Sequence, residues 1–151
     1  MGGNGITIDN TSGVVVHNFR IQKFSGNGIL LEGSDSNVMK GNKFNENNTD
    51  CILLIRSVSN MIIGNVANEN VDDGIQLIQL SNNNIIRGNT ANDHDGDGIT
   101  FSADSEENDV FFNRALDNGD GGGFTDINDQ DTNNFKGNKC DTSNPPVGIC
   151  N

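Results

Sequence analysis

Carboxylates are the residues of this 151-residue chain whose spacing points most directly to chemistry. Twenty-one Asp and Glu oppose nine Lys and Arg, and Asp50, Asp72-Asp73 and Asp97 recur about two dozen residues apart. Two carboxyl groups act as acid and base on a glycosidic bond when they lie roughly 5 to 9.5 Å apart. We therefore predict Asp50, Asp72, Asp73 and Asp97 as candidate catalytic residues.

A second acidic pattern suggests a metal ion. Asp93, Asp95 and Asp97 alternate with other residues, and Asp117 follows Asp93 by 24 positions. Hard carboxylate oxygens in such a pattern suit Ca²⁺, which takes six to eight oxygen ligands. The candidate cofactor is therefore Ca²⁺, with Asp93, Asp95, Asp97 and Asp117 as ligands. A purely structural origin stays open, because Asp, Asn and Gly are the usual residues of exposed turns.

These residues need a scaffold that brings distant positions together, and an internal repeat provides one. Each repeat contains an apolar pair, then a variable residue, then usually a Gly, and finally an Asn. The six closing asparagines are Asn18, Asn42, Asn65, Asn89, Asn113 and Asn138. Apolar residues recur with the same period in two columns that we expect to be buried: Ile6, Ile29, Ile52, Ile75, Ile99 and Phe124, and Val15, Met39, Ile62, Ile86, Val110 and Phe135.

The repeat predicts an all-β fold. Apolar residues alternate with period two, and no stretch has the period of a helix. Short strands repeated every two dozen residues, without room for a crossover helix, are typical of a parallel β-helix. We predict a right-handed solenoid of about six coils with three short strands in each. Residues 1–140 form the coils, and residues 141–151 form a capping loop in the same domain.

The repeated Asn and the cysteines have structural interpretations. Stacked Asn side chains form a hydrogen-bonded ladder, and Asn tolerates the left-handed backbone of a sharp corner. Cys140 and Cys150 bracket the capping loop and are predicted to form a disulfide, while Cys51 is expected to be a buried thiol. Three free thiols remain an alternative.

The segment 82–89, Asn-Asn-Asn-Ile-Ile-Arg-Gly-Asn, followed by Asp-Gly-Ile at 97–99, resembles the consensus of right-handed parallel β-helix repeats. Such repeats occur in NosD-like surface and periplasmic proteins and, more loosely, in pectate lyases, polygalacturonases and alginate epimerases. The resemblance covers residues 4–140 and implies the fold rather than one activity. Asp50 and Asp72-Asp73 resemble the paired acids of polygalacturonases, but the family's His position is Asp97. Asp93-His94-Asp95 is similar to the epimerase motif without its proline.

Charge and hydropathy restrict the classes of partner and the location that the sequence favours. A formal net charge of −12 disfavours nucleic-acid partners, and no apolar run approaches the ~20 residues of a membrane span. The first five residues lack the features of a signal peptide. The cysteine pair nevertheless favours an exported protein at the cell surface, outside the cell or in the periplasm. We expect the open N-terminal end to be covered by upstream sequence or by another chain.

Two functions follow from the sequence. The first is an exported β-helix module associated with the cell surface or with carbohydrate, whose acidic edge binds calcium. The alternative is a polysaccharide-active enzyme, similar to a glycoside hydrolase, lyase or epimerase, that uses the stacked Asp residues of one turn.

Overall fold

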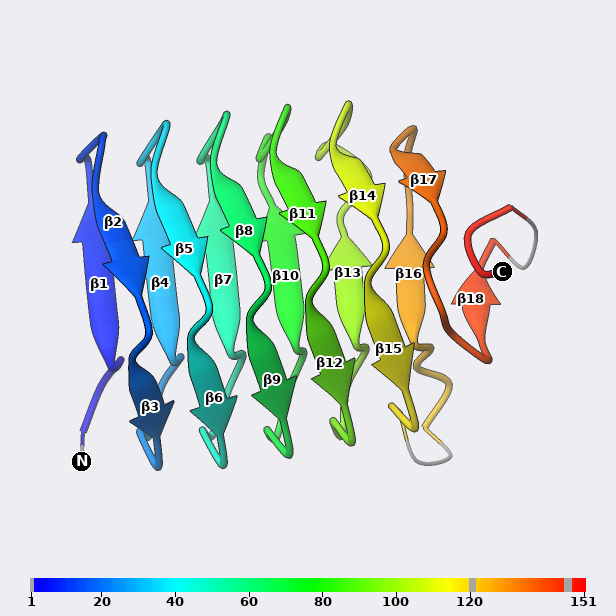
Figure 1. The fold of residues 1–151 in the computed structure, drawn as a ribbon, viewed down its shortest axis with the longest axis horizontal. Helices are drawn as coiled ribbons and strands as arrows, with labels where there is room; N and C mark the ends of the chain where they lie inside the picture. The colour runs from blue at the N-terminus through cyan, green and yellow to red at the C-terminus, as the bar shows by residue number, and fades with distance from the viewer. Residues whose placement is uncertain (1, 120–121, 146–147) are drawn as a thin grey trace.

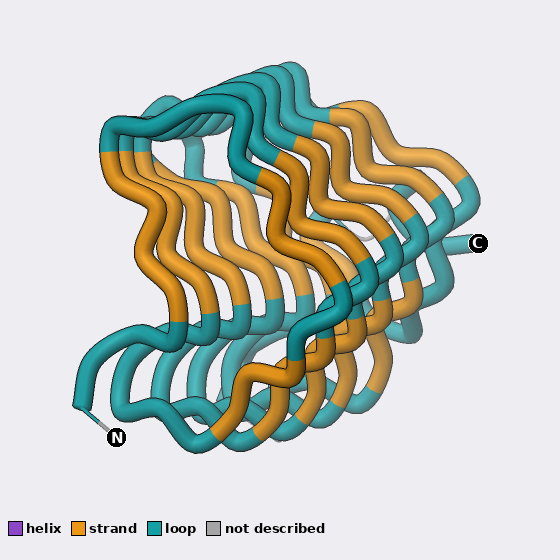
Figure 2. The backbone as a smooth tube through the Cα atoms, turned by 60° about the vertical axis from the view of Figure 1, so that its left-hand side comes forward, coloured by secondary structure: helices purple, strands orange, loops and turns teal. Residues whose placement is uncertain are grey.

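The computed structural model describes residues 2–119, 122–145 and 148–151. Those residues form strands and turns only, so no helix among them could cross a membrane. Successive coils stack side by side into a three-sided solenoid, which confirms the predicted all-β fold with three strands per coil (Figures 1 and 2).

Three parallel sheets form the sides of the solenoid. Sheet A contains β1 (Ile6–Asp9), β4 (Ile29–Glu32), β7 (Ile52–Ile55), β10 (Ile75–Ile78), β13 (Ile99–Phe101), β16 (Ile127–Asp129) and β18 (Ser143–Asn144). Sheet B contains β2 (Val15–His17), β5 (Val38–Lys40), β8 (Met61–Ile63), β11 (Ile85–Arg87), β14 (Asp109–Phe111) and β17 (Asn134–Lys136). Sheet C contains β3 (Arg20–Gln22), β6 (Lys43–Asn45), β9 (Val66–Asn68), β12 (Thr90–Asn92) and β15 (Arg114–Leu116).

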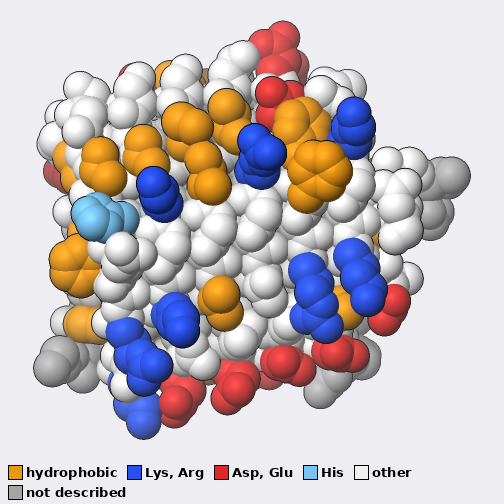
Figure 3. All heavy atoms as spheres, in the orientation of Figure 1, with side chains coloured by type: hydrophobic (Ala, Val, Ile, Leu, Met, Phe, Trp, Pro, Cys, Tyr) orange, Lys and Arg blue, Asp and Glu red, His pale blue; other side chains and the backbone are white. Residues whose placement is uncertain are grey.

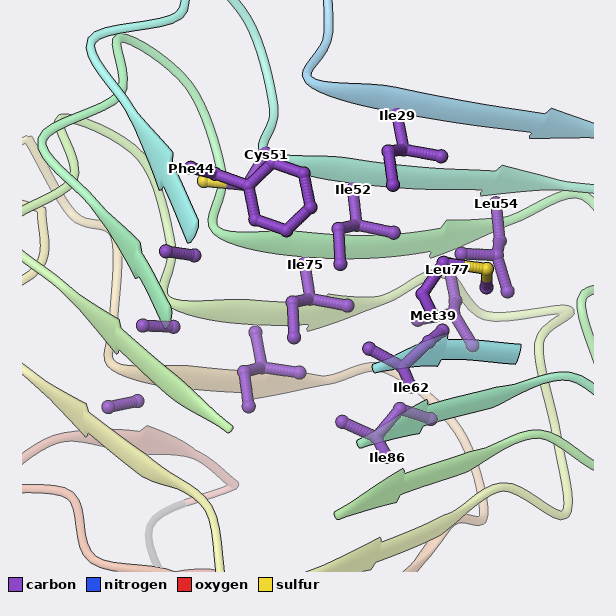
Figure 4. Packing of buried hydrophobic residues seen from close by; sticks show 14 of the residues in the cluster. Ile29, Met39, Phe44, Cys51, Ile52, Leu54, Ile62, Ile75, Leu77 and Ile86 are labelled. Atoms are coloured by element: carbon purple, nitrogen blue, oxygen red, sulfur yellow. The ribbon is translucent and has the colours of Figure 1, made fainter. Parts of the chain in front are cut away.

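The core consists of apolar columns that run along the solenoid axis. Inward residues of sheet A, such as Ile29, Ile52 and Ile75, lie directly above one another and are fully buried (Figure 4). Met39 and Ile62 form an equivalent stack in sheet B. Full burial of each such side chain contributes roughly 1.5 to 3 kcal/mol. Burial of these columns therefore favours the register in which equivalent residues of successive coils lie above one another.

The predicted columns are wrong at three terminal positions. Val16, not Val15, pairs with Met39, because the first coil advances by 23 residues rather than 24. For the same reason Phe19 occupies the ladder position that was predicted for Asn18, and its backbone N–H donates to Asn42 Oδ1. At the other end Ile127 replaces Phe124 in the core, since the last turn into sheet A is longer. Val15, Phe19 and Phe124 are exposed.

The predicted asparagine ladder is present between sheets B and C. Each Asn after Asn42 accepts hydrogen bonds from the backbone N–H and the Nδ2 of the Asn one coil earlier, and Asn42 accepts the backbone N–H of Phe19. The Nδ2 of each ladder Asn donates to a backbone carbonyl of the earlier coil. This B–C ladder consists of Asn42, Asn65, Asn89, Asn113 and Asn138.

A second ladder, not anticipated, lies between sheets A and B. The A–B ladder consists of Asn37, Asn60, Asn84, Asn108 and Asn133. Together the two ladders supply partners for backbone groups that the turns leave outside the sheets, and buried backbone groups require such partners. The A–B and B–C corners are therefore held by amide side chains.

The left-handed residue of the B–C corner is not the ladder Asn but the residue before it. Gly41, Gly64, Gly88 and Gly137 have φ between 61 and 65°. Glycine adopts this region without the Cβ clash that other residues meet. The two residues of the Gly-Asn pair therefore have different roles: the glycine allows the chain to turn, and the asparagine forms hydrogen bonds to the neighbouring coils.

The C-terminal segment packs onto the last coil. β18 pairs in parallel with β16, and a disulfide joins Cys140 to Cys150 as predicted. Cys51 is a buried free thiol, and Asn70 Nδ2 donates to its sulfur. Both cysteine predictions are thus confirmed.

The ladder generates a prediction about stability. Asn89→Ala would leave the backbone N–H of Asn65 without a partner inside the core and would remove a donor from the carbonyl of Ile62. Each buried unpaired group costs roughly 1 to 3 kcal/mol, so we expect the free energy of unfolding to fall by about 3 kcal/mol. Urea denaturation measures this loss. The control is Asn48→Ala at an exposed turn, and equal losses in the two variants would show that the ladder contributes no more than a surface amide.

Candidate carboxylate site

The candidate site lies in the turns that lead from sheet C into sheet A. Asp50, Asp73 and Asp97 lie two residues before β7, β10 and β13 of sheet A, respectively. Because the strands are stacked in register, the three side chains form one column, which we call the carboxylate column. All three are at most 3% exposed.

The carboxylate column is a ladder that runs in the opposite sense to the asparagine ladders. Asp50 Oδ1 accepts the backbone N–H of Asp73 at 3.0 Å, and Asp73 Oδ1 accepts that of Asp97 at 2.7 Å. In the first part of the column Asn27 Oδ1 accepts the N–H of Asp50. The turn must be glycine at residue 96, because a Cβ there would overlap Asp73 Oδ1.

The second carboxylate oxygens differ from coil to coil. Asp97 Oδ2 accepts from Thr100 Oγ1 and Asn128 Nδ2, so this carboxylate is fully bonded. Asp73 Oδ2 accepts from Gln76 Nε2 at 2.7 Å. The residue three after Asp50 is Leu53, which has no donor to offer. Within the described part of the chain no hydrogen-bond donor contacts Asp50 Oδ2.

Asp72 completes a cluster with this column. Oxygen atoms of Asp50, Asp72 and Asp73 lie within 4.8 Å of one another, and Asp72 is exposed while the other two are buried. The structure therefore brings together three of the four predicted catalytic residues. Asp97 lies one coil further along, where its oxygens are already committed to hydrogen bonds.

Burial makes two of these carboxyl groups unusually basic. Loss of solvation raises the pKa of Asp50 from 3.8 to about 7, with further contributions from the charges of Asp73 and Asp72. Loss of solvation also raises the pKa of Asp73 to about 6, despite the N–H bond from Asp97. Like charges at this spacing repel each other strongly in a poorly solvated site. The pair therefore retains a proton at a higher pH than exposed carboxyl groups do.

The four predicted calcium ligands are not brought together. Asp93 and Asp117 occupy the left-handed corner after sheet C, with φ of 58°, in a column with Glu46 and Glu69. Asp95 is exposed on the turn, whereas Asp97 is buried in the carboxylate column. Among the described residues, the acidic group that could hold an ion is instead that of Asp50, Asp72 and Asp73.

His94 belongs to a third ladder, which sequence reasoning missed. Its Nδ1 accepts the backbone N–H of Asn70 at 3.2 Å, and its Nε2 lies 3.1 Å from the carbonyl of Ala67. Its own backbone N–H donates to Asn118 Oδ1. The C–A ladder thus consists of Asn47, Asn70, His94 and Asn118, at intervals of 23 and 24 residues that could have identified it.

The ladder position explains the protonation state of His94. Burial lowers its pKa from 6.5 to about 4, although the hydrogen bonds to Ala67 and Asn70 and the charge of Asp95 oppose the shift. The neutral ring accepts at Nδ1 and donates at Nε2, as an asparagine amide does with its two ends. The histidine of Asp93-His94-Asp95, the segment that is similar to the epimerase motif, is therefore only 2% exposed, and both of its ring nitrogens are hydrogen-bonded.

The described residues form no pocket, and only one of the three clustered carboxylates is exposed. A ligand would contact the carboxylate site at the turns that lead from sheet C into sheet A. Asp72, the exposed member of the cluster, would be the first group that such a ligand meets.

Comparisons with known proteins agree with the architecture. The family model described as a right handed beta helix region matches residues 2–151. No curated protein matches the chain significantly. Among solved structures, one of a single-site mutant of the periplasmic alginate epimerase AlgG is 24% identical with a TM-score of 0.77, covering 85% of this chain and 30% of that one.

Two further structures of the same epimerase show the same likeness. A second mutant is 20% identical with a TM-score of 0.58, covering 85% of this chain and 35% of that one. Another AlgG structure is 19% identical with a TM-score of 0.56, covering 97% and 39%. This chain therefore spans 30 to 39% of the epimerase's length, and at these identities the likeness concerns the fold.

The place of His94 in the C–A ladder predicts an acid-sensitive stability. A histidine whose pKa is depressed by folding stabilises the protein fully above pH 6.5, and that stabilisation is lost as the pH falls toward 4. We expect His94→Asn to remove this loss, which amounts to about 3 kcal/mol. Urea denaturation of both proteins across this pH range measures the difference in their free energies of unfolding. The carboxylates are the same in both proteins, so their contributions cancel. Parallel pH profiles would contradict the assignment.

Proposed function

Because this chain belongs to the right-handed β-helix family, we propose that it is a carbohydrate-associated module whose carboxylate site binds Ca²⁺. The association with carbohydrate is supported by the shared fold of the periplasmic alginate epimerase. Export is proposed on the same likeness and on the Cys140–Cys150 disulfide, since disulfides persist in oxidising compartments.

The observation that carries the calcium proposal is the convergence of Asp50, Asp72 and Asp73 within 4.8 Å. Their oxygens are hard ligands, and Asp50 Oδ2 and the exposed Asp72 carboxylate have no donor among the described residues. Ca²⁺ accepts carboxylates at flexible angles and completes its shell with water on an open surface. A bound cation would also replace the proton that the raised pKa values of Asp50 and Asp73 otherwise require.

Thermal melting with added calcium tests this proposal. Above the pKa of about 7 of Asp50, saturating Ca²⁺ should raise the melting temperature, with about 2.7 kcal/mol of stabilisation at a hundredfold excess over Kd. Asp72→Asn should abolish the rise, because it removes an exposed ligand without disturbing a hydrogen bond of the fold. Asp95→Asn, in the next turn, should leave it intact. A rise that survives Asp72→Asn but not Asp95→Asn would place the ion elsewhere.

A polysaccharide-active enzyme is the second candidate, and the pKa values of the cluster favour it specifically. Asp50, with a pKa of about 7, can donate a proton under conditions where Asp73, with a pKa of about 6, is ionised. Two carboxyl groups with different proton affinities are what acid–base cleavage of a glycosidic bond requires. Their separation is close to the ~5 Å of retaining glycosidases.

A panel of neutral and uronic polysaccharides tests the enzyme proposal. Product formation should follow a bell-shaped pH profile with limbs near pH 6 and 7, set by the pair as a unit. Asp73→Asn should lower the rate by about a hundredfold or more, whereas Asp95→Asn should not change it. Unchanged turnover in Asp73→Asn would rule out this acid–base pair.

A further inference from the structure

Most of the basic residues of this acidic protein gather on one face. That face is formed by sheets B and C and the corner between them, comprising residues 15–22, 38–45, 61–68, 85–92, 109–116 and 134–139; we call it the basic face. It carries seven of the nine bases and one of the twenty-one acids, a formal charge of +6, which leaves −18 on the rest of the chain. The seven bases are Arg20, Lys40, Lys43, Arg87, Arg114, Lys136 and Lys139.

The register of the strands arranges these bases in two rows along the solenoid. The row on sheet B has Lys40, Arg87 and Lys136 on alternate coils. The row on sheet C has Arg20 and Lys43 at one end. Its other end has Arg114 and Lys139. The two rows flank the corner of glycines and ladder asparagines, as the blue side chains in Figure 3 show.

All seven bases of the basic face are exposed, and none forms an ion pair within the described part of the chain. The two bases outside the face behave differently: Lys23 pairs with Glu46, and Arg56 pairs with Glu32. Cations held near one another without counter-charges repel, so their concentration on one face costs free energy unless an anion binds there. The unpaired state of this set, beside two paired bases, points to an external anionic partner.

Acidic residues border the basic face. The corner after sheet C carries Glu46, Glu69, Asp93 and Asp117 in one exposed column. A partner bound across this border would meet repulsion, whereas a narrow partner lying along the sheet B row would meet bases that alternate with uncharged residues such as Ile63 and Phe111. The border therefore selects a slender chain parallel to the solenoid axis and disfavours a broad polyanion such as a nucleic-acid duplex.

We propose that the basic face binds a linear acidic polysaccharide that lies along the solenoid axis. This inference rests on the proposed carbohydrate association and names the class of carbohydrate as one that carries carboxylates or similar anions. Coils repeat every ~4.8 Å, so bases on alternate coils are ~9.6 Å apart and present a regular row to a polymer with regularly spaced charges. The site is separate from the carboxylate cluster, which lies in the turns that lead from sheet C into sheet A.

Binding to immobilised polygalacturonate, a linear polyuronate, tests the proposal, with dextran as the neutral comparison. A chelator is present throughout, so that calcium at the carboxylate site cannot bridge protein and polymer. The protein should bind polygalacturonate and not dextran, and added salt should weaken the binding, since exposed charges are screened. Binding that persists with the chelator present does not require calcium, which separates this result from the calcium proposal.

Charge-removing variants locate the surface. Lys40→Gln with Arg87→Gln removes two bases of the sheet B row and should weaken binding about twentyfold, from a fewfold loss for each contact. Lys23→Gln with Arg56→Gln removes the same charge outside the basic face and should change affinity less than about twofold. Equal losses in the two double variants, or no binding to polygalacturonate at all, would overturn the proposal.

Two other partners would also overturn it. Equal affinity for a DNA duplex, lost in the same double variant, would make the surface a nucleic-acid site. Association of the chain with itself, dissolved by salt and lost in the Lys40→Gln, Arg87→Gln variant, would identify the acidic side of a second copy as the occupant. Sedimentation of the protein alone measures this last outcome.

Discussion

The hydrogen bond between equivalent positions of successive coils is the interaction on which this structure depends. A side-chain amide that accepts from one coil while donating to a carbonyl of that same coil ties neighbours together at every corner. Asn65 is representative: it is bonded to Asn42, to Asn89 and to the carbonyl of Met39. Buried polar groups are costly when unpaired, so a coil that slipped by one residue would lose the whole set. This bonding enforces the register, and the apolar columns then become continuous.

The carboxylate column shows what happens when this arrangement loses its donor. Asp can accept the backbone N–H of the next coil, but it has no amide to offer to its neighbour. Asp97 is compensated by Thr100 and Asn128, and Asp73 by Gln76, whereas Asp50 faces Leu53. The carboxylate of this column with the fewest hydrogen-bond donors is Asp50, and Asp72 adds a third carboxylate beside it and Asp73. A cluster that resists full ionisation within a well-bonded solenoid is the strongest functional signal in the fold, because such perturbed groups gather at sites that bind ions or transfer protons.

The regularity of the solenoid also organises its exterior. Outward residues of each sheet form straight rows, so a residue type that recurs at one position of the repeat becomes a stripe. On sheets B and C bases recur along these rows, while the corner beyond sheet C is acidic. The exterior therefore has two chemically opposed regions on one molecule, and a net charge of −12 describes neither. Partners that the overall charge would repel can still approach the basic face.

Much of this architecture was determined by the sequence itself, because the period of the repeat is both a sequence property and a spatial one. Residues 23 or 24 apart become vertical neighbours, so the inner columns of sheets A and B, the B–C ladder and the meeting of Asp50 with Asp73 follow from counting. Counting failed where the period changed: the short first coil moved Asn18 off the ladder, and the long last turn moved Phe124 out of the core.

Only the tertiary structure decided the properties that depend on burial and on the surroundings of each side chain. It placed His94 in a ladder rather than on an exposed loop, satisfied Asp97 with donors from three different positions, and left Asp50 buried with one oxygen unpaired. It also gathered seven bases from five coils onto one face. Composition adds charges without regard to position, whereas solvation and Coulomb energies depend on where each charge lies.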